Sequence, residues 1–79
     1  PEEITKSYEE LINGQIPILL AGLKSPSNKK DLDSLLQYLK NSQKDLTQLL
    51  ESNSRQPAWV LKVIELNKKG IALIQAHNP

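Results

Sequence analysis

The sequence predicts an all-α fold, an up-down-up antiparallel three-helix bundle that forms a single domain over residues 1–79. Apolar residues recur every three or four positions in three segments, and polar breaks at 24–28 and 52–57 separate them. No segment alternates strictly between polar and apolar residues, and Phe is absent, so strands are not expected. Short connections between helices favour antiparallel neighbours, which completes the predicted topology.

The first predicted helix covers residues 2–24. Pro17 lies inside it and removes the N–H that would bond the carbonyl of Asn13, while Gly14 lies close enough to absorb a bend. We therefore expect a kink near residues 13–17. The residues predicted to face the core are Tyr8, Ile12, Ile16, Leu19 and Leu23.

The second predicted helix covers residues 29–52. Asn28 or Ser27 is suited to cap its start, and Asp31 in the first turn favours the helix dipole. Alternating spacings of four and three residues define a core seam typical of helices that cross at a shallow angle. The seam consists of Leu32, Leu36, Leu39, Gln43, Leu46 and Leu50.

The third predicted helix covers residues 57–76. Ser54 or Gln56 precedes Pro57, which suits a first helical position because no N–H donor is needed there. Gly70 costs roughly 1 kcal/mol relative to Ala inside a helix, so it suggests close approach of a neighbour or a partner. The core seam consists of Val60, Ile64, Asn67, Ile71 and Ile74.

Two seam positions are polar, Gln43 and Asn67. A buried amide without partners costs on the order of a few kcal/mol. We therefore expect these two side chains to hydrogen-bond across the bundle and fix its register.

Composition argues against catalysis and cofactors. A chain of 79 residues without Cys has no thiolate nucleophile, no disulfide and little room for a deep pocket. His77 stands near the end of the chain, without a partner at metal-ligand spacing. We expect no enzyme activity, no cofactor and no metal. The acidic residues of the first helix, Glu2, Glu3, Glu9 and Glu10, fall in its first turns, where they favour the helix dipole.

Charge and hydropathy also exclude some partners. The net charge is +1, and the basic pairs at 29–30 and 68–69 lack the interleaved aromatic residues of a nucleic-acid platform. The apolar run at 16–23 is far shorter than the roughly 20 residues that span a bilayer. We expect no nucleic acid, no direct membrane insertion and a monomer. Because the chain begins with Pro1, we interpret it as a domain cut from a longer protein.

Each helix carries apolar residues beside its seam. A helix in a three-helix bundle contacts two neighbours and needs a wide apolar stripe, so these residues fit either a core or a binding surface. Periodicity does not separate the two. The second stripes are Leu11, Gln15, Ile18 and Gly22 in the first helix, Leu35, Ser42 and Leu49 with Tyr38 in the second, and Trp59, Val63, Leu66, Gly70 and Leu73 in the third.

Three segments resemble the GAT domain of the Golgi-localised gamma-ear-containing ARF-binding adaptors and the target-of-Myb proteins. Residues 12–23, with the run INGQI followed by ILLAGL, are similar to the family's V-S-G-N-V-x-V-M-x-E-M-L. Residues 31–39 resemble D-L-x-L-L-Q-E-L, and residues 63–74 resemble E-I-L-x-x-N-D-x-L-x-x-V-L. The chain departs from the family at Pro17, which interrupts a continuous helix, and at Gly22, where the family has Met or Leu.

This resemblance implies a ubiquitin-binding adaptor module in cargo sorting, cytoplasmic and peripheral to endosomes, the Golgi or endocytic sites. Such bundles use two shallow apolar patches that hold ubiquitin weakly or a helical accessory protein. By position match, the first patch comprises Leu11, Gln15, Ile18, Gly22, Leu35 and Tyr38, with Asp31 or Asp33 for a basic rim on ubiquitin. The second comprises Val63, Leu66 and Leu73, with Leu49 opposite.

Two other functions fit the same residues. One is a structural segment of a helical scaffold, similar to one repeat of a spectrin-like array, with no ligand of its own. The other is a module that binds an amphipathic peptide in the groove between the second and third helices, without ubiquitin.

Overall fold

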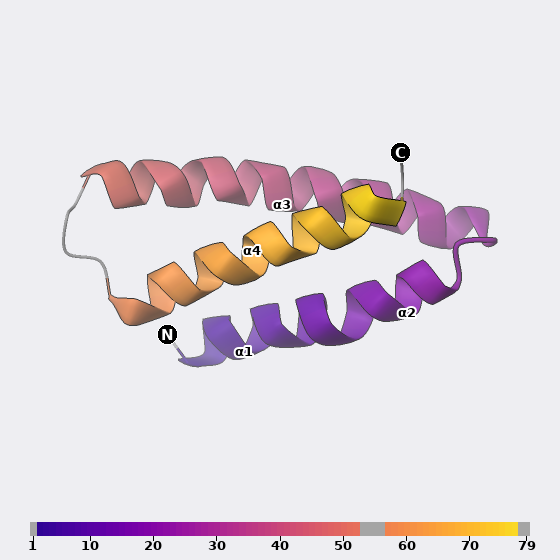
Figure 1. The fold of residues 1–79 in the computed structure, drawn as a ribbon, viewed down its shortest axis with the longest axis horizontal. Helices are drawn as coiled ribbons and strands as arrows, with labels where there is room; N and C mark the ends of the chain where they lie inside the picture. Colours follow the sequence, from indigo (N-terminus) through magenta and orange to yellow (C-terminus); the bar gives the residue numbers. More distant parts are fainter. Residues whose placement is uncertain (1, 53–56, 78–79) are drawn as a thin grey trace.

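The computed structural model describes residues 2–52 and 57–77, and it is a three-helix bundle, as predicted (Figure 1). The first predicted helix consists of α1 (Glu2–Glu10), a π turn η1 (Leu11–Gln15) and α2 (Ile16–Ala21). It is followed by α3 (Pro26–Ser52) and α4 (Ala58–His77). No strand occurs in these two described stretches.

The bundle is elongated, with extents of 44 × 22 × 16 Å. The helix α4 lies between the α1–α2 segment and α3 in Figure 1, and it packs against both. The segment α2 comes close to α3, whereas α1 and α3 diverge and are bridged by α4. Among the described residues, the backbones of the first segment and α3 therefore come close to each other at the α2 end.

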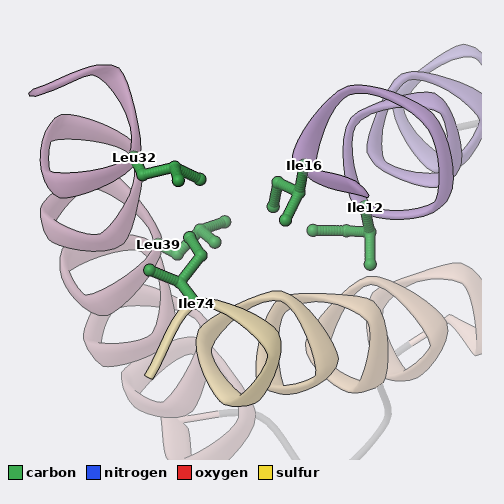
Figure 2. Close-up of a cluster of buried hydrophobic side chains, with 5 residues drawn as sticks. All are labelled: Ile12, Ile16, Leu32, Leu39 and Ile74. Carbon is green, nitrogen blue, oxygen red and sulfur yellow. The ribbon is translucent and has the colours of Figure 1, made fainter. Parts of the chain in front are cut away.

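The core is built mainly from aliphatic side chains of all three arms of the bundle, which are the first arm (α1, η1 and α2), α3 and α4. Ile12 and Ile16 point from the first arm toward Leu32 and Leu39 of α3 and Ile74 of α4 (Figure 2). Burial of such side chains is the main stabilising contribution in a chain of this size. The other buried apolar residues are Val60, Val63 and Ile64.

Most seam predictions are confirmed. Eight seam residues are buried, and most of the others are half-buried. The prediction that Leu50 faces the core is wrong. Leu50 lies near the C-terminal end of α3 and is 39% exposed, because fewer described residues pack against α3 there. The buried seam residues are Ile12, Ile16, Leu32, Leu39, Val60, Ile64, Asn67 and Ile74.

The disturbance predicted around Pro17 takes the form of a π turn. The N–H of Ile16 donates to the carbonyl of Leu11, five residues back instead of four. Pro17 follows in the first turn of α2, where its missing N–H is tolerated. The flanking residues keep ordinary right-handed helical angles, so the wider turn is accommodated without backbone strain.

The start of α3 differs from the prediction. The helix begins at Pro26, and Ser25 is its cap: the N–H of Asn28 donates to Ser25 Oγ at 3.4 Å. Asn28 has another function, because its Nδ2 donates to the Gly22 carbonyl at 3.1 Å and so closes the turn after α2. At the start of α4, the helix begins at Ala58, one residue after Pro57, and the predicted caps Ser54 and Gln56 lie outside the described residues.

Gly70 allows the three arms to approach closely. A Cβ at this position would lie 2.5 Å from Ile12 Cδ1 and 2.9 Å from Leu39 Cδ1. Real Cβ contacts are essentially never that short, so a side chain here would force the buried ends of Ile12 and Leu39 to shift. The close approach predicted for Gly70 is therefore to its own neighbours in the fold.

The polar seam pair forms the predicted contact. Asn67 is fully buried, and its Nδ2 donates to Gln43 Oε1 at 3.0 Å and to the Leu39 carbonyl at 2.8 Å. Both acceptors belong to α3, so these bonds join α3 to α4 in the interior.

Candidate functional site

A shallow groove of about 600 Å³ lies between the α2 end of the first arm and the N-terminal half of α3. It is formed where α2 and α3 run side by side and their outward flanks leave an open channel. Its walls are formed by Gln15, Ile18 and Leu19 on one side and by Asp31, Ser34, Leu35 and Tyr38 on the other.

The two walls differ in chemistry. The wall from the first segment is mainly apolar, with Gln15 of η1 as its polar member, and Ile18 is 71% exposed, the most exposed large apolar side chain of the described residues. On the α3 wall, Asp31, Ser34 and Tyr38 follow one another at spacings of three and four residues, which places them in one row along the helix. The groove therefore combines an apolar contact surface with one polar edge.

The Tyr38 end of the groove is connected to a second tyrosine. Tyr38 is exposed, whereas Tyr8 of α1 is half-buried against the core cluster. Burial raises the pKa of Tyr8 above its ordinary value, partly opposed by hydrogen bonding with Ser42 of α3 and reinforced by Tyr38. These contacts link α1 to α3 next to Tyr38, where the two backbones diverge.

A second, smaller cleft lies between α1 and the start of α4. It is lined by a mixture of acidic and basic side chains around Trp59, and Lys62 Nζ lies 3.0 Å from Glu9 Oε1 across it. This exposed pair, together with Lys69 Nζ donating to Asn13 Oδ1 at 2.7 Å, joins α4 to the first arm. The Glu9–Lys62 pair of the cleft thus links α1 to α4.

The acidic residues and His77 do not come together as a metal site in the described stretches. No group of three or more His, Asp or Glu side chains among them is arranged to hold a metal ion. The ring Nδ1 of His77 lies 3.1 Å from the Leu73 carbonyl, within its own helix. None of the described helices has both the length and the apolar character needed to cross a membrane.

Comparison with known proteins adds no relative. No protein-family model, curated protein or solved structure matches the chain.

The groove coincides with the larger part of the predicted first patch. Of the eight residues predicted there, it brings together Gln15, Ile18, Asp31, Leu35 and Tyr38. Leu11 instead packs against the core cluster, and Asp33 is exposed outside the groove lining. Gly22 faces the side chain of Asn28 in the turn after α2.

Two lining residues were not among the predicted site residues. Leu19 was assigned to the core, and it does pack against the core cluster while its outer edge borders the groove. Ser34 was not selected, although it lies three residues after Asp31 and four before Tyr38, on the same face of the helix. That spacing was the available signal.

The predicted second patch does not form an open surface. Val63 is 2% exposed, so it cannot contact a partner in this fold, and Leu66 and Leu73 pack against the core cluster. Leu49 is exposed on α3. The second stripe of α4 is therefore largely core, because α4 lies between the other two arms and buries a wide face.

Proposed function

We propose that this chain is a non-catalytic binding module that holds ubiquitin in the groove between α2 and α3, as an adaptor in endosomal, trans-Golgi or endocytic sorting. The observation that supports this proposal is the exposure of Ile18 beside Leu35 and Tyr38, at the positions that the GAT resemblance assigns to the first patch. An isoleucine this exposed contributes little to folding, whereas the centre of a binding surface benefits from it.

The expected affinity is low. A groove bordered by seven side chains and open along its length belongs to the small end of protein interfaces. A Kd on the order of micromolar or weaker follows from an interface of that size. A longer host protein with several binding modules would raise the effective affinity through avidity.

Titration of isotope-labelled domain with unlabelled ubiquitin, followed by amide shifts in solution NMR, tests the proposal. We expect shift changes at residues 15–19 and 31–38, with little change along α4. Absence of shifts at millimolar ubiquitin would remove ubiquitin as the ligand and leave the bundle intact.

Three Asp substitutions separate binding from folding. Ile18→Asp should weaken ubiquitin binding by about tenfold or more without unfolding the domain, because the side chain is exposed. Leu61→Asp is the matched control, with the same change at a 48% exposed position of α4 that does not line the groove, and it should bind as the wild type does. Ile64→Asp should unfold the domain, because it buries a charge. Unfolding of the Ile18 variant would show that Ile18 belongs to the core.

A peptide helix is the competing ligand. The burial of Val63 argues against the α3–α4 face as its site, so the groove between α2 and α3 is where it would bind. If an amphipathic peptide shifts the groove residues and ubiquitin does not, the chain is a helix-binding module, and the ubiquitin proposal is wrong.

A further inference from the structure

Three lysines lie together on the outer face of the α3–α4 pair. Asn67 of α4 bonds the Leu39 carbonyl and Gln43 Oε1 of α3, which fixes the register of these two antiparallel helices. In an antiparallel pair, the residues one position after such contacts turn toward the same side of both helices. All the residues that follow these contacts are exposed lysines, and they are Lys40, Lys44 and Lys68.

The first arm packs on the opposite side of the pair. It meets positions one residue before the seam, at Gly70 of α4 and at Leu35 and Tyr38 of α3. The lysine face, which we define as Lys40, Lys44 and Lys68, is therefore turned away from the groove and is not covered by the first arm.

The lysine face places like charges close together. Lys40 and Lys44 are one helical turn apart, a spacing at which two like charges destabilise a helix. The register sets Lys68 opposite Lys40, at a flanking position where helices packed in this way usually carry opposite charges. Within the described stretches none of the three forms a salt bridge, whereas Lys62 of the same α4 is paired with Glu9.

We propose that the lysine face is a docking surface for an acidic segment of a partner protein, a short stretch with several successive Asp or Glu side chains. Carboxylates placed among the three ammonium groups would replace their mutual repulsion by attraction. Exposed ion pairs contribute little each, so the contact is weak and sensitive to salt. The inference does not depend on ubiquitin, because the groove lies on the other side of the α3–α4 pair.

The charge pattern of the whole face favours a short segment over an anionic membrane. Glu65 precedes Lys68 by one turn on α4. Asp33 and Glu51 lie one position after the seam residues near the two ends of α3, so they belong to the same face. Positive charge is therefore confined to the middle of the face. A bilayer with anionic lipids would approach these carboxylates too, whereas a short acidic segment meets the lysines alone.

Titration with capped hexaglutamate tests the proposal, and hexaglutamine is the neutral control. Isotope-labelled domain is followed by NMR at roughly 0.1 M salt, where the Debye length is about 10 Å and distant charges are screened. We expect hexaglutamate to shift residues 37–47 and 65–72 and hexaglutamine to shift none. Binding should weaken further when salt is raised to about 0.5 M.

Two triple variants with equal loss of charge locate the site. The face variant carries Lys40→Gln, Lys44→Gln and Lys68→Gln, and the turn variant carries Lys24→Gln, Lys29→Gln and Lys30→Gln. We expect the face variant to bind hexaglutamate about tenfold more weakly, and the turn variant to stay within about twofold of the wild type. The face variant should be folded and should bind ubiquitin as the wild type does, because none of its changes lines the groove.

Several outcomes overturn the inference. They are absence of hexaglutamate binding, equal binding of the two peptides, and equal weakening in the two variants. Co-sedimentation with phosphatidylcholine vesicles containing phosphatidylserine is the remaining arm. A chain that binds these vesicles through the lysine face and does not bind hexaglutamate would be a membrane-docking module there. Loss of ubiquitin binding alone would overturn the proposed function and leave the lysine face as argued.

Discussion

Gly70 is a residue at which the helices of the bundle pack closely against one another. An added methyl group would meet Ile12 Cδ1 at 2.5 Å and Leu39 Cδ1 at 2.9 Å, and both atoms belong to fully buried side chains. Gly70→Ala should therefore destabilise the fold by about 1–3 kcal/mol, although alanine is the better helix former. Urea unfolding monitored by circular dichroism measures this difference in the free energy of unfolding.

Gly14 provides the matched control at residue scale. A Cβ at this position meets nothing within 4 Å, so Gly14→Ala has only the conformational effect. We expect it to leave stability unchanged or raise it by up to about 1 kcal/mol. If Gly70→Ala stabilised the protein as Gly14→Ala does, the three arms would be further apart than the structure places them.

The sequence predicted that something approaches Gly70, and it did not specify what. A glycine inside an apolar stripe fits a neighbour within the fold or a partner outside it equally well. The answer depends on the positions of Ile12 and Leu39, which lie on other helices. The same argument applies to Val63, whose burial follows from the central place of α4 and not from its own spacing.

At the scale of elements, the π turn brings Tyr8 and Ile16 closer to the same side of the helix axis in the first arm. An α-helix turns by 100° per residue, so Ile16 would lie about 80° around the axis from Tyr8, eight positions earlier. Both nevertheless face the bundle interior, along with Ile12 between them. The wider turn at Leu11–Gln15 removes most of that offset. Packing of the inner face therefore favours the π turn, and Pro17 is compatible with it.

This reasoning predicts the outcome of Pro17→Ala. The substitution restores an N–H, but an ordinary α-helix through this segment would rotate Ile16 out of the core or Tyr8 away from it. We expect the π turn to persist and the free energy of unfolding to change by less than about 1 kcal/mol. Backbone chemical shifts of residues 10–17 report the turn directly.

A continuous α-helix in the Pro17→Ala variant would contradict this account. It would mean that the missing N–H alone imposes the π turn and that the core tolerates a rotation of α2. Gly14→Ala, which keeps Pro17, serves as the reference for the shifts expected when the π turn is present.

The elements themselves were predictable, and their details were not. Three periodic segments and two polar breaks predicted the helices and their antiparallel order. The π turn was not identified, because the spacing of four residues from Tyr8 to Ile12 and again to Ile16 also occurs in an ordinary helix. The cap of α3 was placed at Asn28 or Ser27 instead of Ser25, because both residue types, Asn and Ser, favour caps.

At the scale of the whole molecule, the groove depends on the relative phase of α2 and α3, which local patterns do not contain. Five of the eight predicted residues of the first patch line it, because periodicity fixes which residues share a helix face. Leu11, Gly22 and Asp33 fall outside the lining. Leu11 packs against the core cluster, Asn28 closes the turn at Gly22, and Asp33 lies on a different face of α3 from Asp31 and Leu35. The sequence predicted which residues share a face of each helix, and the packing of α2 against α3 determines which of these residues line the groove.

The register of the bundle is set where α3 and α4 pack against each other, by Asn67 with Gln43 and the Leu39 carbonyl. Asn67→Asp has nearly the same shape, yet a carboxylate there would face two acceptor oxygens in the interior. We expect it to cost about 3 kcal/mol or more at neutral pH. Asn67→Ala, which loses the same two bonds without a charge, should cost about 1–2 kcal/mol at any pH between 4 and 8.

The pH dependence of the free energy of unfolding distinguishes these two variants and tests the contact between Asn67 and α3. Burial raises the pKa of an aspartic acid at position 67 above its unfolded value of about 4. Its protonated form can donate one hydrogen bond, so the Asp variant is stable below about pH 4 and loses stability as the pH rises through the raised folded pKa. Urea unfolding at several pH values measures this slope against the Ala variant. A flat profile for Asn67→Asp would place residue 67 in water, which is incompatible with α3 and α4 sharing a buried amide.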